Sequence, residues 1–337
     1  MNQIHDHPRV TLLRQETPIE PLARLSAKWD IDLFIKRDDI AGAPFGGNKS
    51  RQLEFYLGAA QRANADTVLI TGAVQSNFVR TTAAAAASLG MHTIVQLENR
   101  VPDTDERYQR SGNVLLLDIL GAEVMHYPVG EDEAGADRAL RARADELRNQ
   151  GKRPYVIPLA LGNPPLGALG YVRAGYEIVA QDPDFDVVVV ASGSGLTHAG
   201  LLAGVRGAGS KARVIGSCVR RPQVQQRLRI QTVLKALSEL TDDASHITEN
   251  DIVIWDGALA PGYGQLGPQA SNAMQTMARN EGVFLDPVYT AKGFAAIPAL
   301  VESGEIPKGA RVLFVHTGGL ASLFAYEDPL KRAFGAQ

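Results

Sequence analysis

The chain has a single cysteine, Cys218, among 337 residues, so no intrachain disulfide can form. A lone cysteine at the end of a predicted strand is usually a small apolar core residue, and we expect Cys218 to be buried. The segment 1–7 lacks the basic and then apolar pattern of an export signal. We therefore expect a cytoplasmic protein.

The chain also lacks an excess of either charge. Its 34 basic and 37 acidic residues leave a formal charge of −3, with no basic stripe or tail that would indicate nucleic acid or a membrane surface as a partner. The longest uncharged apolar run, 83–89, is too short to span a bilayer. The seven histidines show no spacing typical of metal ligands, and we predict no metal. Small molecules are the expected partners.

Hydrophobic residues make up 45% of the chain, which is enough for a large core, and the length predicts about two domains. From about residue 65 onward, short β-branched runs alternate with helical patterns. The run 187–190 is four valines, apolar on both faces as in a buried parallel strand. We predict an α/β fold of two doubly wound units with open, mostly parallel sheets. The Pro/Gly-rich segment 161–167 marks a break between them.

The strands are expected at residues 33–36, 68–71, 92–97, 123–127, 155–157, 187–190, 213–218, 252–254 and 312–316. The helices are expected at residues 76–89, 113–120, 133–149, 169–180, 198–205, 222–240, 268–281 and 291–303. The first 48 residues show little alternation of their own, and we expect them to pack on the second unit. Open α/β sheets bind ligands at the carboxyl ends of their strands, so a site is expected in the loops that follow strands.

Lys49 follows a glycine pair in the run 45–51, Phe-Gly-Gly-Asn-Lys-Ser-Arg, at what reads as the first turn of a helix. A lysine amine attacks a carbonyl only when it is neutral, which requires a desolvated or electropositive pocket. The glycines would let the backbone approach a flat ring closely. Taken alone, the segment is more typical of an ordinary turn into a helix.

Two loops after predicted strands place amide hydrogens at the start of a helix. In the loop 72–77, Ser76 or Asn77 begins an alanine-rich helix and could hold a carboxylate, although a simple helix N-cap explains the same residues. The loop 192–197, Ser-Gly-Ser-Gly-Leu-Thr, is typical of a phosphate cradle. A dinucleotide site would need an acidic residue at the end of the next strand, and 216–219 has none. No Gly-Lys-Ser/Thr motif is present, so a single phosphate fits better.

A third loop, His-Thr-Gly-Gly at 316–319, has glycines that would let the backbone lie beside a planar ring. Tyr263 and Tyr289 lie on proline-led turns that could aim a phenol into a cleft, although loop tyrosines are more often half-buried packing residues. His198 and His316 are expected to cap or pack. A lysine on glycines, a carboxylate loop, a loop for one phosphate and a ring-edge loop together describe a pyridoxal phosphate site.

These loops, in this order, resemble those of fold type II pyridoxal phosphate enzymes, the tryptophan synthase β family. More narrowly, the chain is similar to the branch that contains D-cysteine desulfhydrase and 1-aminocyclopropane-1-carboxylate deaminase. The resemblance extends from about residue 37 to 326, and the motifs that carry it are Gly-Gly-Asn-Lys at 46–49, Gln-Ser-Asn at 75–77, Leu-Gly-Ala-Leu-Gly-Tyr at 166–171, Ala-Pro-Gly-Tyr-Gly at 260–264, Asp-Pro-Val-Tyr-Thr at 286–290 and His-Thr-Gly-Gly at 316–319. It implies a homodimer whose cofactor lies in a cleft between a smaller domain, 50–160, and a larger domain made of 1–49 and 161–337.

For the cofactor, the resemblance makes Lys49 the Schiff-base lysine. Asn77 would hydrogen-bond the ring hydroxyl of pyridoxal 5'-phosphate. Thr317, with Thr290 nearby, would meet the pyridine nitrogen. The cradle for the phosphate would consist of Gly193, Ser194, Gly195, Leu196 and Thr197.

For the substrate, the resemblance implies that Ser76 and the neighbouring amides take the carboxylate. The other residues expected to contact the substrate there are Gln75, Asn77 and Phe78. Tyr263 and Tyr289 would flank the substrate. The implied catalytic residues are therefore Lys49, Ser76, Tyr263 and Tyr289.

Deaminases of this branch typically carry glutamate where this chain has Thr290 and leucine where it has Thr317. A neutral hydroxyl does not stabilise a protonated pyridine nitrogen as a carboxylate does, which favours expulsion of a β-substituent. The implied activity is β-elimination from D-cysteine to pyruvate, ammonia and hydrogen sulfide. L-cysteate or another β-substituted alanine, 1-aminocyclopropane-1-carboxylate, and a non-catalytic amino-acid-binding sensor remain alternatives.

Two residues depart from the desulfhydrase pattern. Phe78 stands where histidine is usual, and Gln52 where lysine is usual. Without these two cations a permanently anionic sulfonate would lose hydration and gain no partner, so we expect D-cysteine to be preferred to L-cysteate. A preference for cysteate would require another cation at the leaving group, such as Arg80 or Arg173.

Overall fold

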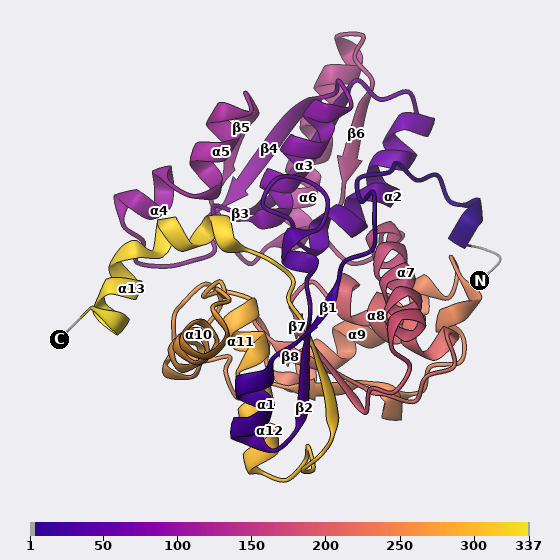
Figure 1. The fold of residues 1–337 in the computed structure, drawn as a ribbon. Coiled ribbons are helices and arrows are strands. Elements are labelled where there is room, and N and C mark those ends of the chain that lie inside the picture. The colour runs from indigo at the N-terminus through magenta and orange to yellow at the C-terminus, as the bar shows by residue number, and fades with distance from the viewer. Residues whose placement is uncertain (1–3, 336–337) are drawn as a thin grey trace.

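The computed structural model describes residues 4–335, which are organised by two open β-sheets (Figure 1). One sheet has six strands in the order β1-β2-β10-β7-β8-β9 and is parallel except for β1, which pairs antiparallel with β2. The other has four strands in the order β5-β4-β3-β6 and is parallel throughout. The predicted α/β fold with open, mostly parallel sheets is confirmed.

The strands of the two sheets come from different parts of the chain. The larger sheet consists of β1 (Ile19–Pro21), β2 (Asp32–Lys36), β7 (Val187–Ser192), β8 (Arg213–Cys218), β9 (Val253–Trp255) and β10 (Arg311–Val315). The smaller sheet consists of β3 (Thr67–Ala73), β4 (His92–Glu98), β5 (Glu123–Tyr127) and β6 (Pro154–Ile157). Since β1 and β2 join the larger sheet, residues 19–36 pack on the second unit, whereas Val10 packs in the core of the smaller unit. The domain boundaries at 50 and 160 stay a prediction.

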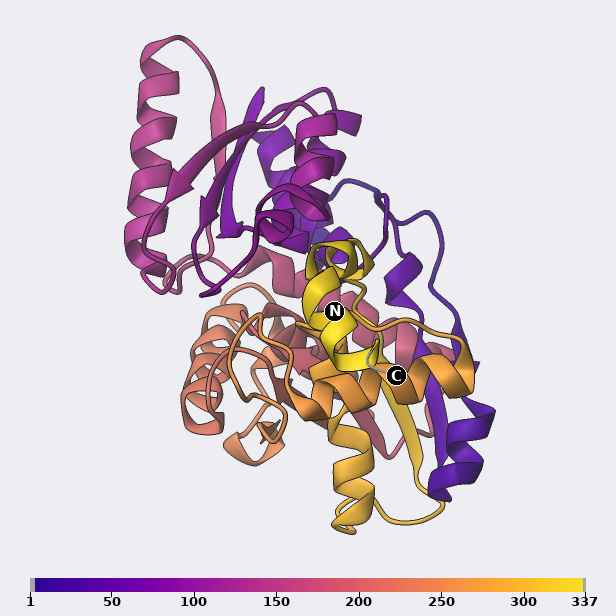
Figure 2. The ribbon, with the colours of Figure 1, turned by 90° about the vertical axis from the view of Figure 1, so that its left-hand side faces the viewer.

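Helices cover both faces of each sheet, and Figure 2 shows the smaller unit above the larger one. The α-helices are α1 (Ala23–Trp29), α2 (Asn48–Arg62), α3 (Asn77–Ser88), α4 (Glu106–Arg110), α5 (Asn113–Ile119), α6 (Glu133–Asn149), α7 (Leu166–Gln181), α8 (Leu196–Gly207), α9 (Gln223–Leu237), α10 (Pro268–Glu281), α11 (Thr290–Phe294), α12 (Ala296–Glu302) and α13 (Glu327–Phe334). Short 3₁₀ helices are η1 (Ile4–Asp6), η2 (Asp38–Ile40), η3 (Asp242–Ala244), η4 (Glu249–Asp251) and η5 (Leu320–Tyr326). None of the described helices is long and apolar enough to cross a membrane.

Helices α7 and α8 pack closely because glycines stand at their contact. A Cβ on Gly200 would lie 2.2 Å from the Ala168 carbonyl oxygen, and one on Gly204 would lie 2.1 Å from that of Val172. Only glycine is compatible with such close backbone contacts. This packing fixes the position of α8, whose N-terminus follows the buried central strand β7.

The single helix predicted at 291–303 is wrong, because the structure has two helices there, α11 and α12. Pro298 is the third residue of α12, and its ring nitrogen has no hydrogen to donate to the carbonyl of Phe294, four residues earlier. The chain therefore ends one helix at Phe294 and begins another at Ala296. The short elements β1 and α1 and the C-terminal helix α13 were also not predicted.

Candidate functional site

Lys49 lies in the first turn of α2, and the loops around it hold that turn in place. Gly46 and Gly47 have φ angles of 56° and 105°, and a Cβ on Gly46 would lie 1.7 Å from the Asp39 carbonyl oxygen. The Asn48 amide donates to the Thr317 carbonyl oxygen at 3.1 Å. The predicted ring-edge loop after β10 therefore lies directly against the turn that carries Lys49.

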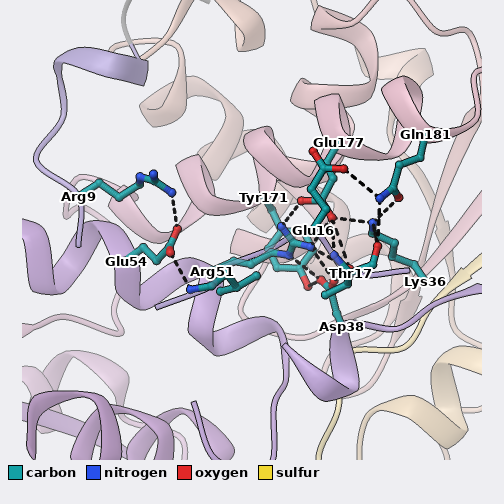
Figure 3. Close-up of polar contacts among 11 residues, drawn as sticks. Arg9, Glu16, Thr17, Lys36, Asp38, Arg51, Glu54, Tyr171, Glu177 and Gln181 are labelled. Carbon is teal, nitrogen blue, oxygen red and sulfur yellow. Dashed lines mark hydrogen bonds and ion pairs between the residues drawn. The ribbon is translucent and has the colours of Figure 1, made fainter. Parts of the chain in front are cut away.

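A buried ionic network anchors the same turn of α2 (Figure 3). Arg51 donates to Asp38 through Nε at 2.9 Å and through Nη2 at 2.8 Å, and its Nη1 donates to Glu177 of α7 at 2.7 Å. Burial opposes ionisation of Asp38, but the Arg51 guanidinium outweighs it, so the pKa of Asp38 lies below its ordinary value. Lys36 and Tyr171 donate to Glu177 and Asp38 respectively. The network ties α2 to the larger sheet and to α7.

The amine of Lys49 lies at the cleft, and none of the described carboxylates pairs with it. The Phe78 ring centroid is 5.2 Å from the Lys49 nitrogen, and burial lowers the pKa of Lys49 to about 8. Such an amine is roughly half neutral at pH 8, whereas an ordinary lysine is less than about 1% neutral there. Lys49 thus has the property that attack on a carbonyl requires.

The loop after β7 forms the predicted cradle at the N-terminus of α8. Four of its five predicted residues line the cleft, and the exception is Leu196. Gly195 has a φ angle of 97°, which favours glycine. The hydroxyl of Thr197 accepts hydrogen bonds from Asn48 Nδ2 and Gln52 Nε2, both at 2.8 Å. Its own proton is then available to an anion, alongside the unpaired amides of the first turn of α8.

Two arginines support the cradle from its outer side. Arg221 Nη1 donates to the Gly193 carbonyl oxygen at 3.2 Å. Arg229 Nε donates to that of Ser194 at 2.7 Å. Both arginines also pair with Glu133 at the start of α6, at 2.7 and 3.0 Å. The cradle is therefore braced against the smaller unit, with positive charge behind the loop.

The loop after β3 places Ser76 and Asn77 at the cleft. Ser76 is the N-cap of α3, and its Oγ accepts from the Val79 amide at 3.2 Å, so the capping interpretation is confirmed. Asn77 Oδ1 accepts from Asn113 Nδ2 at 3.0 Å, which leaves the Asn77 side-chain amide nitrogen as a donor. Phe78 lines the cleft beside them.

The structure does not bring Gln75 to the cleft lining. Its Nε2 donates to the carbonyl oxygens of Tyr108 and Ser111, at 2.6 and 2.9 Å, and its Oε1 accepts from the Asn113 amide at 2.9 Å. Through these hydrogen bonds the Gln75 side chain joins the loop before α3 to the segment around α4 and α5. The expected contact of the Gln75 side chain with substrate is therefore corrected.

Tyr263 and Tyr289 meet at the cleft, from turns far apart in the sequence. Their hydroxyl oxygens are 2.6 Å apart, and their rings meet edge to face with centroids 6.0 Å apart. Burial raises the pKa of Tyr289 well above its ordinary value, so this phenol stays protonated. The pair can hold and donate a proton inside the cleft.

Of the two threonines expected at the pyridine nitrogen, Thr317 lines the cleft and Thr290 does not. Thr290 is fully buried, and its hydroxyl lies 2.7 Å from the Asp286 amide nitrogen and 2.7 Å from Asp286 Oδ1. The Thr290 hydroxyl thus holds the turn before α11 and is not available to a ligand, which corrects that assignment.

The residues expected to be structural are buried. Cys218 is fully buried in the core, and burial raises the pKa of its thiol to about 12. His316 Nε2 lies 2.9 Å from the Phe284 carbonyl oxygen, as expected for a packing residue. His198 is also buried, with Nδ1 3.2 Å from Ser192 Oγ, although it contributes to the cleft wall.

Neither cation named for the leaving group lies at the cleft. Arg80 is buried, and its Nη1 donates to the Pro44 carbonyl oxygen at 2.5 Å. Arg173 of α7 lies in a separate pocket. The arginines that do line the cleft are Arg100 and Arg220, which our sequence reasoning did not single out. Each stands two residues after the end of a parallel strand, where ligand sites form in open α/β sheets. This position is the signal that could have indicated them.

The groups found at the cleft line a single pocket. The charged side chains of the lining are Lys49, Arg100 and Arg220, and no aspartate or glutamate is among the lining residues. These groups fit pyridoxal phosphate. The unpaired lysine amine suits its aldehyde, the cradle of amides and a hydroxyl suits its phosphate, and the glycines where the backbone borders the cleft suit its flat ring. The cationic lining also suits an anionic substrate.

Comparison with known proteins gives a family match. The protein-family model described as "Pyridoxal-phosphate dependent enzyme" matches residues 10–318. The D-cysteine desulfhydrase of Yersinia pseudotuberculosis serotype O:1b (strain IP 31758) is 40% identical over 331 residues, which cover 96% of this chain and 98% of that protein. The D-cysteine desulfhydrase of Salmonella typhi is 41% identical over 325 residues, which cover 95% of this chain and 96% of that protein.

Two crystal structures are also similar to this chain. One, described as an ACC deaminase homologue, superposes with a TM-score of 0.88 and 35% identity, covering 99% of this chain and 98% of that one. An O-ureido-L-serine synthase superposes with a TM-score of 0.64 and 20% identity, covering 97% and 95% of the two chains, and shows the shared fold. The predicted resemblance and the predicted cofactor are confirmed, and the chain belongs to the pyridoxal-phosphate dependent enzyme family.

Proposed function

We propose that the protein catalyses β-elimination from D-cysteine, giving pyruvate, ammonia and hydrogen sulfide. The observation that carries the proposal is the Lys49 amine, which lies at the cleft without a counter-ion and shares that cleft with the phosphate cradle. The relatives named D-cysteine desulfhydrase support the choice of substrate, since they align with this chain over nearly its whole length. As a lyase of this family, the protein acts on a small amino acid.

When bound, pyridoxal phosphate accepts the electron pair that the α-proton leaves behind. Lys49 binds the cofactor, and an amine with a pKa of about 8 is suited to move the α-proton near neutral pH. Ser76 and Asn77 at the start of α3 orient the substrate carboxylate with amide and side-chain donors. The hydrogen-bonded phenols of Tyr263 and Tyr289 supply a proton for the departing sulfur.

The neutral side chain of Thr317 supports elimination over ring opening. It is the threonine of the predicted pair that lines the cleft, and no lining residue offers a carboxylate to a pyridine nitrogen. No lining side chain would stabilise a protonated pyridine nitrogen, and this favours loss of a β-substituent. We therefore propose that 1-aminocyclopropane-1-carboxylate is not a substrate.

We also propose that the protein forms a homodimer in the cytoplasm, where a lone cysteine stays reduced. The side chains of Phe284 and Phe324 are 64% and 63% exposed and lie in one apolar groove beside α13. Exposed apolar grooves of this kind are typical of protein interfaces. Light scattering should give twice the monomer mass, and Phe324→Glu should reduce it; a monomeric wild type would contradict the proposal.

The test of the activity is a panel of D-cysteine, L-cysteine, L-cysteate, β-chloro-D-alanine and 1-aminocyclopropane-1-carboxylate, with pyruvate and 2-oxobutyrate measured separately. We expect pyruvate and one equivalent of sulfide from D-cysteine. Lys49→Ala should lose nearly all turnover, whereas Lys308→Ala, a control on an exposed lysine, should not. Faster formation of 2-oxobutyrate from the cyclopropane than of pyruvate from any alanine derivative would contradict the proposal.

A further inference from the structure

Two arginines line the cleft in positions that the proposed elimination has not yet used. Arg100 follows β4 in the smaller unit, and Arg220 follows β8 in the larger unit. Their side chains are only 5% and 6% exposed, so their charges are held within the protein. Ordering and desolvating two guanidinium groups at a ligand site is costly unless the site uses them.

Both arginines retain hydrogen-bonding capacity. Arg100 donates to Glu98 through Nε at 2.8 Å, and its Nη2 lies 2.7 Å from the same carboxylate oxygen without making a hydrogen bond, so among the described residues no acceptor takes a hydrogen bond from either terminal nitrogen. Arg220 pairs with Glu133 at 2.6 Å and Glu131 at 2.8 Å, and its Nε is buried with no partner in residues 4–335. Each guanidinium is therefore fixed in orientation by a carboxylate while keeping an N–H donor in reserve.

The charge around these two arginines is not balanced by the buried carboxylates. Four guanidinium groups with side-chain exposures of 16% or less belong to the cluster, those of Arg100, Arg220, Arg221 and Arg229. The carboxylates that pair with them and are similarly buried are Glu98 and Glu133, because Glu131 is 66% exposed. Four positive and two negative buried charges leave an excess of two positive charges at one wall of the cleft.

The cofactor phosphate does not account for the arginines at the lining. The guanidinium groups of Arg221 and Arg229 donate hydrogen bonds to backbone carbonyl oxygens of the cradle loop. Arg220 instead lies against Tyr263, with 5.8 Å between the guanidinium carbon and the ring centroid. Burial raises the pKa of Tyr289, and the charge of Arg100 acts on that phenol in the opposite direction. Arg100 and Arg220 thus belong to the tyrosine side of the cleft, where the departing group is expected.

We infer that Arg100 and Arg220 form an anion subsite that binds an oxyanion carried on the β-carbon of the substrate. The inference rests on the proposed β-elimination and extends it to alanines with an anionic β-substituent, of which a sulfonate is the simplest sulfur case. The C–S bond breaks with its electron pair on sulfur, so that one sulfonate substrate and one water give pyruvate, hydrogen sulfite and ammonium. The subsite supplies the cation at the leaving group that Gln52 and Phe78 do not, so a sulfonate is accepted alongside D-cysteine.

Binding of a substrate fragment to the holoenzyme tests the subsite without relying on turnover. The probe is 3-sulfopropanoate, which has no amine to react, and the reference is propanoate, which shares its carboxylate and lacks the sulfonate. Titration calorimetry should show at least tenfold tighter binding of the sulfonate, with the advantage shrinking as salt is added. Arg100→Gln and Arg220→Gln should each reduce the advantage to threefold or less. Arg173→Gln, which removes the same charge outside the cleft, should retain it.

Several outcomes would overturn the subsite. They are equal affinity of the wild type for the two probes, an advantage that salt does not weaken, or equal loss of both probes in the variants, which would mean that the arginines bind the carboxylate. If the glutamine variants do not fold, Arg220→Lys keeps the charge opposite Glu133 and should give an intermediate advantage. Turnover of D-cysteine is measured separately, so its absence alongside arginine-dependent binding of the sulfonate would contradict only the proposed substrate.

Discussion

The pKa of Lys49 makes a quantitative prediction about how the protein captures its cofactor. Burial lowers this pKa to about 8, and only the neutral amine attacks the aldehyde. At pH 7.5 an amine with a pKa near 8 is about 24% neutral, whereas one at 10.5 is about 0.1% neutral. The structure therefore predicts capture at pH 7.5 that is roughly 200 times faster than an ordinary lysine in the same cleft would allow.

The assay is stopped-flow absorbance after mixing apoprotein with pyridoxal phosphate between pH 6 and 10.5. Rates with a simple alkylamine, expressed per neutral amine at each pH, correct for ionisation of the cofactor itself. The corrected rate should rise with pH and level off above about 8. Lys49→Arg, which keeps the charge and removes the nucleophile, should show no capture. A rate that keeps rising through pH 10, or normal capture by Lys49→Arg, would refute the reasoning.

Three further predictions concern stability, proton transfer and burial. Asp38→Asn removes the carboxylate that pairs with buried Arg51 and should lower the free energy of unfolding, measured with urea, by about 3 to 5 kcal/mol. The pKa of Asp38 in the folded protein is depressed. Its contribution to the stability of the wild type should therefore be complete above pH ~4 and fade as the pH falls below that. Tyr289→Phe breaks the 2.6 Å hydroxyl contact and should lower kcat for D-cysteine by about 10²-fold or more with a smaller change in KM, whereas Tyr176→Phe, outside the cleft, should leave both within twofold. Cys218 should react with a disulfide reagent only as fast as the protein unfolds, and rapid labelling of the native protein would contradict its place in the core.

Much of the fold follows from local patterns in the sequence. The valine run of β7 had to be a buried strand, and it lies between β10 and β8 as such a strand should. The order of the strands could not be predicted from local patterns, because it depends on pairing between strands that are far apart in the sequence. The split of 291–303 at Pro298 was readable from the sequence in principle, since a proline at that position removes a helix hydrogen bond.

The site was predicted where glycines and helix starts determine backbone geometry, and missed where side chains compete for partners. The turn of Lys49 and the cradle depend on local backbone shape, and both lie at the cleft. Gln75 was misplaced because nearby carbonyls of α4 and the following turn take up its amide. Arg100 and Arg220 were missed because each lies near acidic residues in sequence or in space. An arginine in that setting is usually interpreted as one partner of a surface ion pair.

The most direct test of the central claim is to find which lysine carries the cofactor. The holoenzyme is reduced with borohydride and digested, and the peptide bearing a phosphopyridoxyl group is identified by mass spectrometry. Lys292 is the internal control, because burial also lowers its pKa to about 8, but its amine already donates to the carbonyl oxygens of Leu259 and Gly262 at 2.9 and 2.6 Å. We predict that the label lies on Lys49 alone. A label on Lys292, or no labelled lysine in a protein that still turns over D-cysteine, would contradict the account.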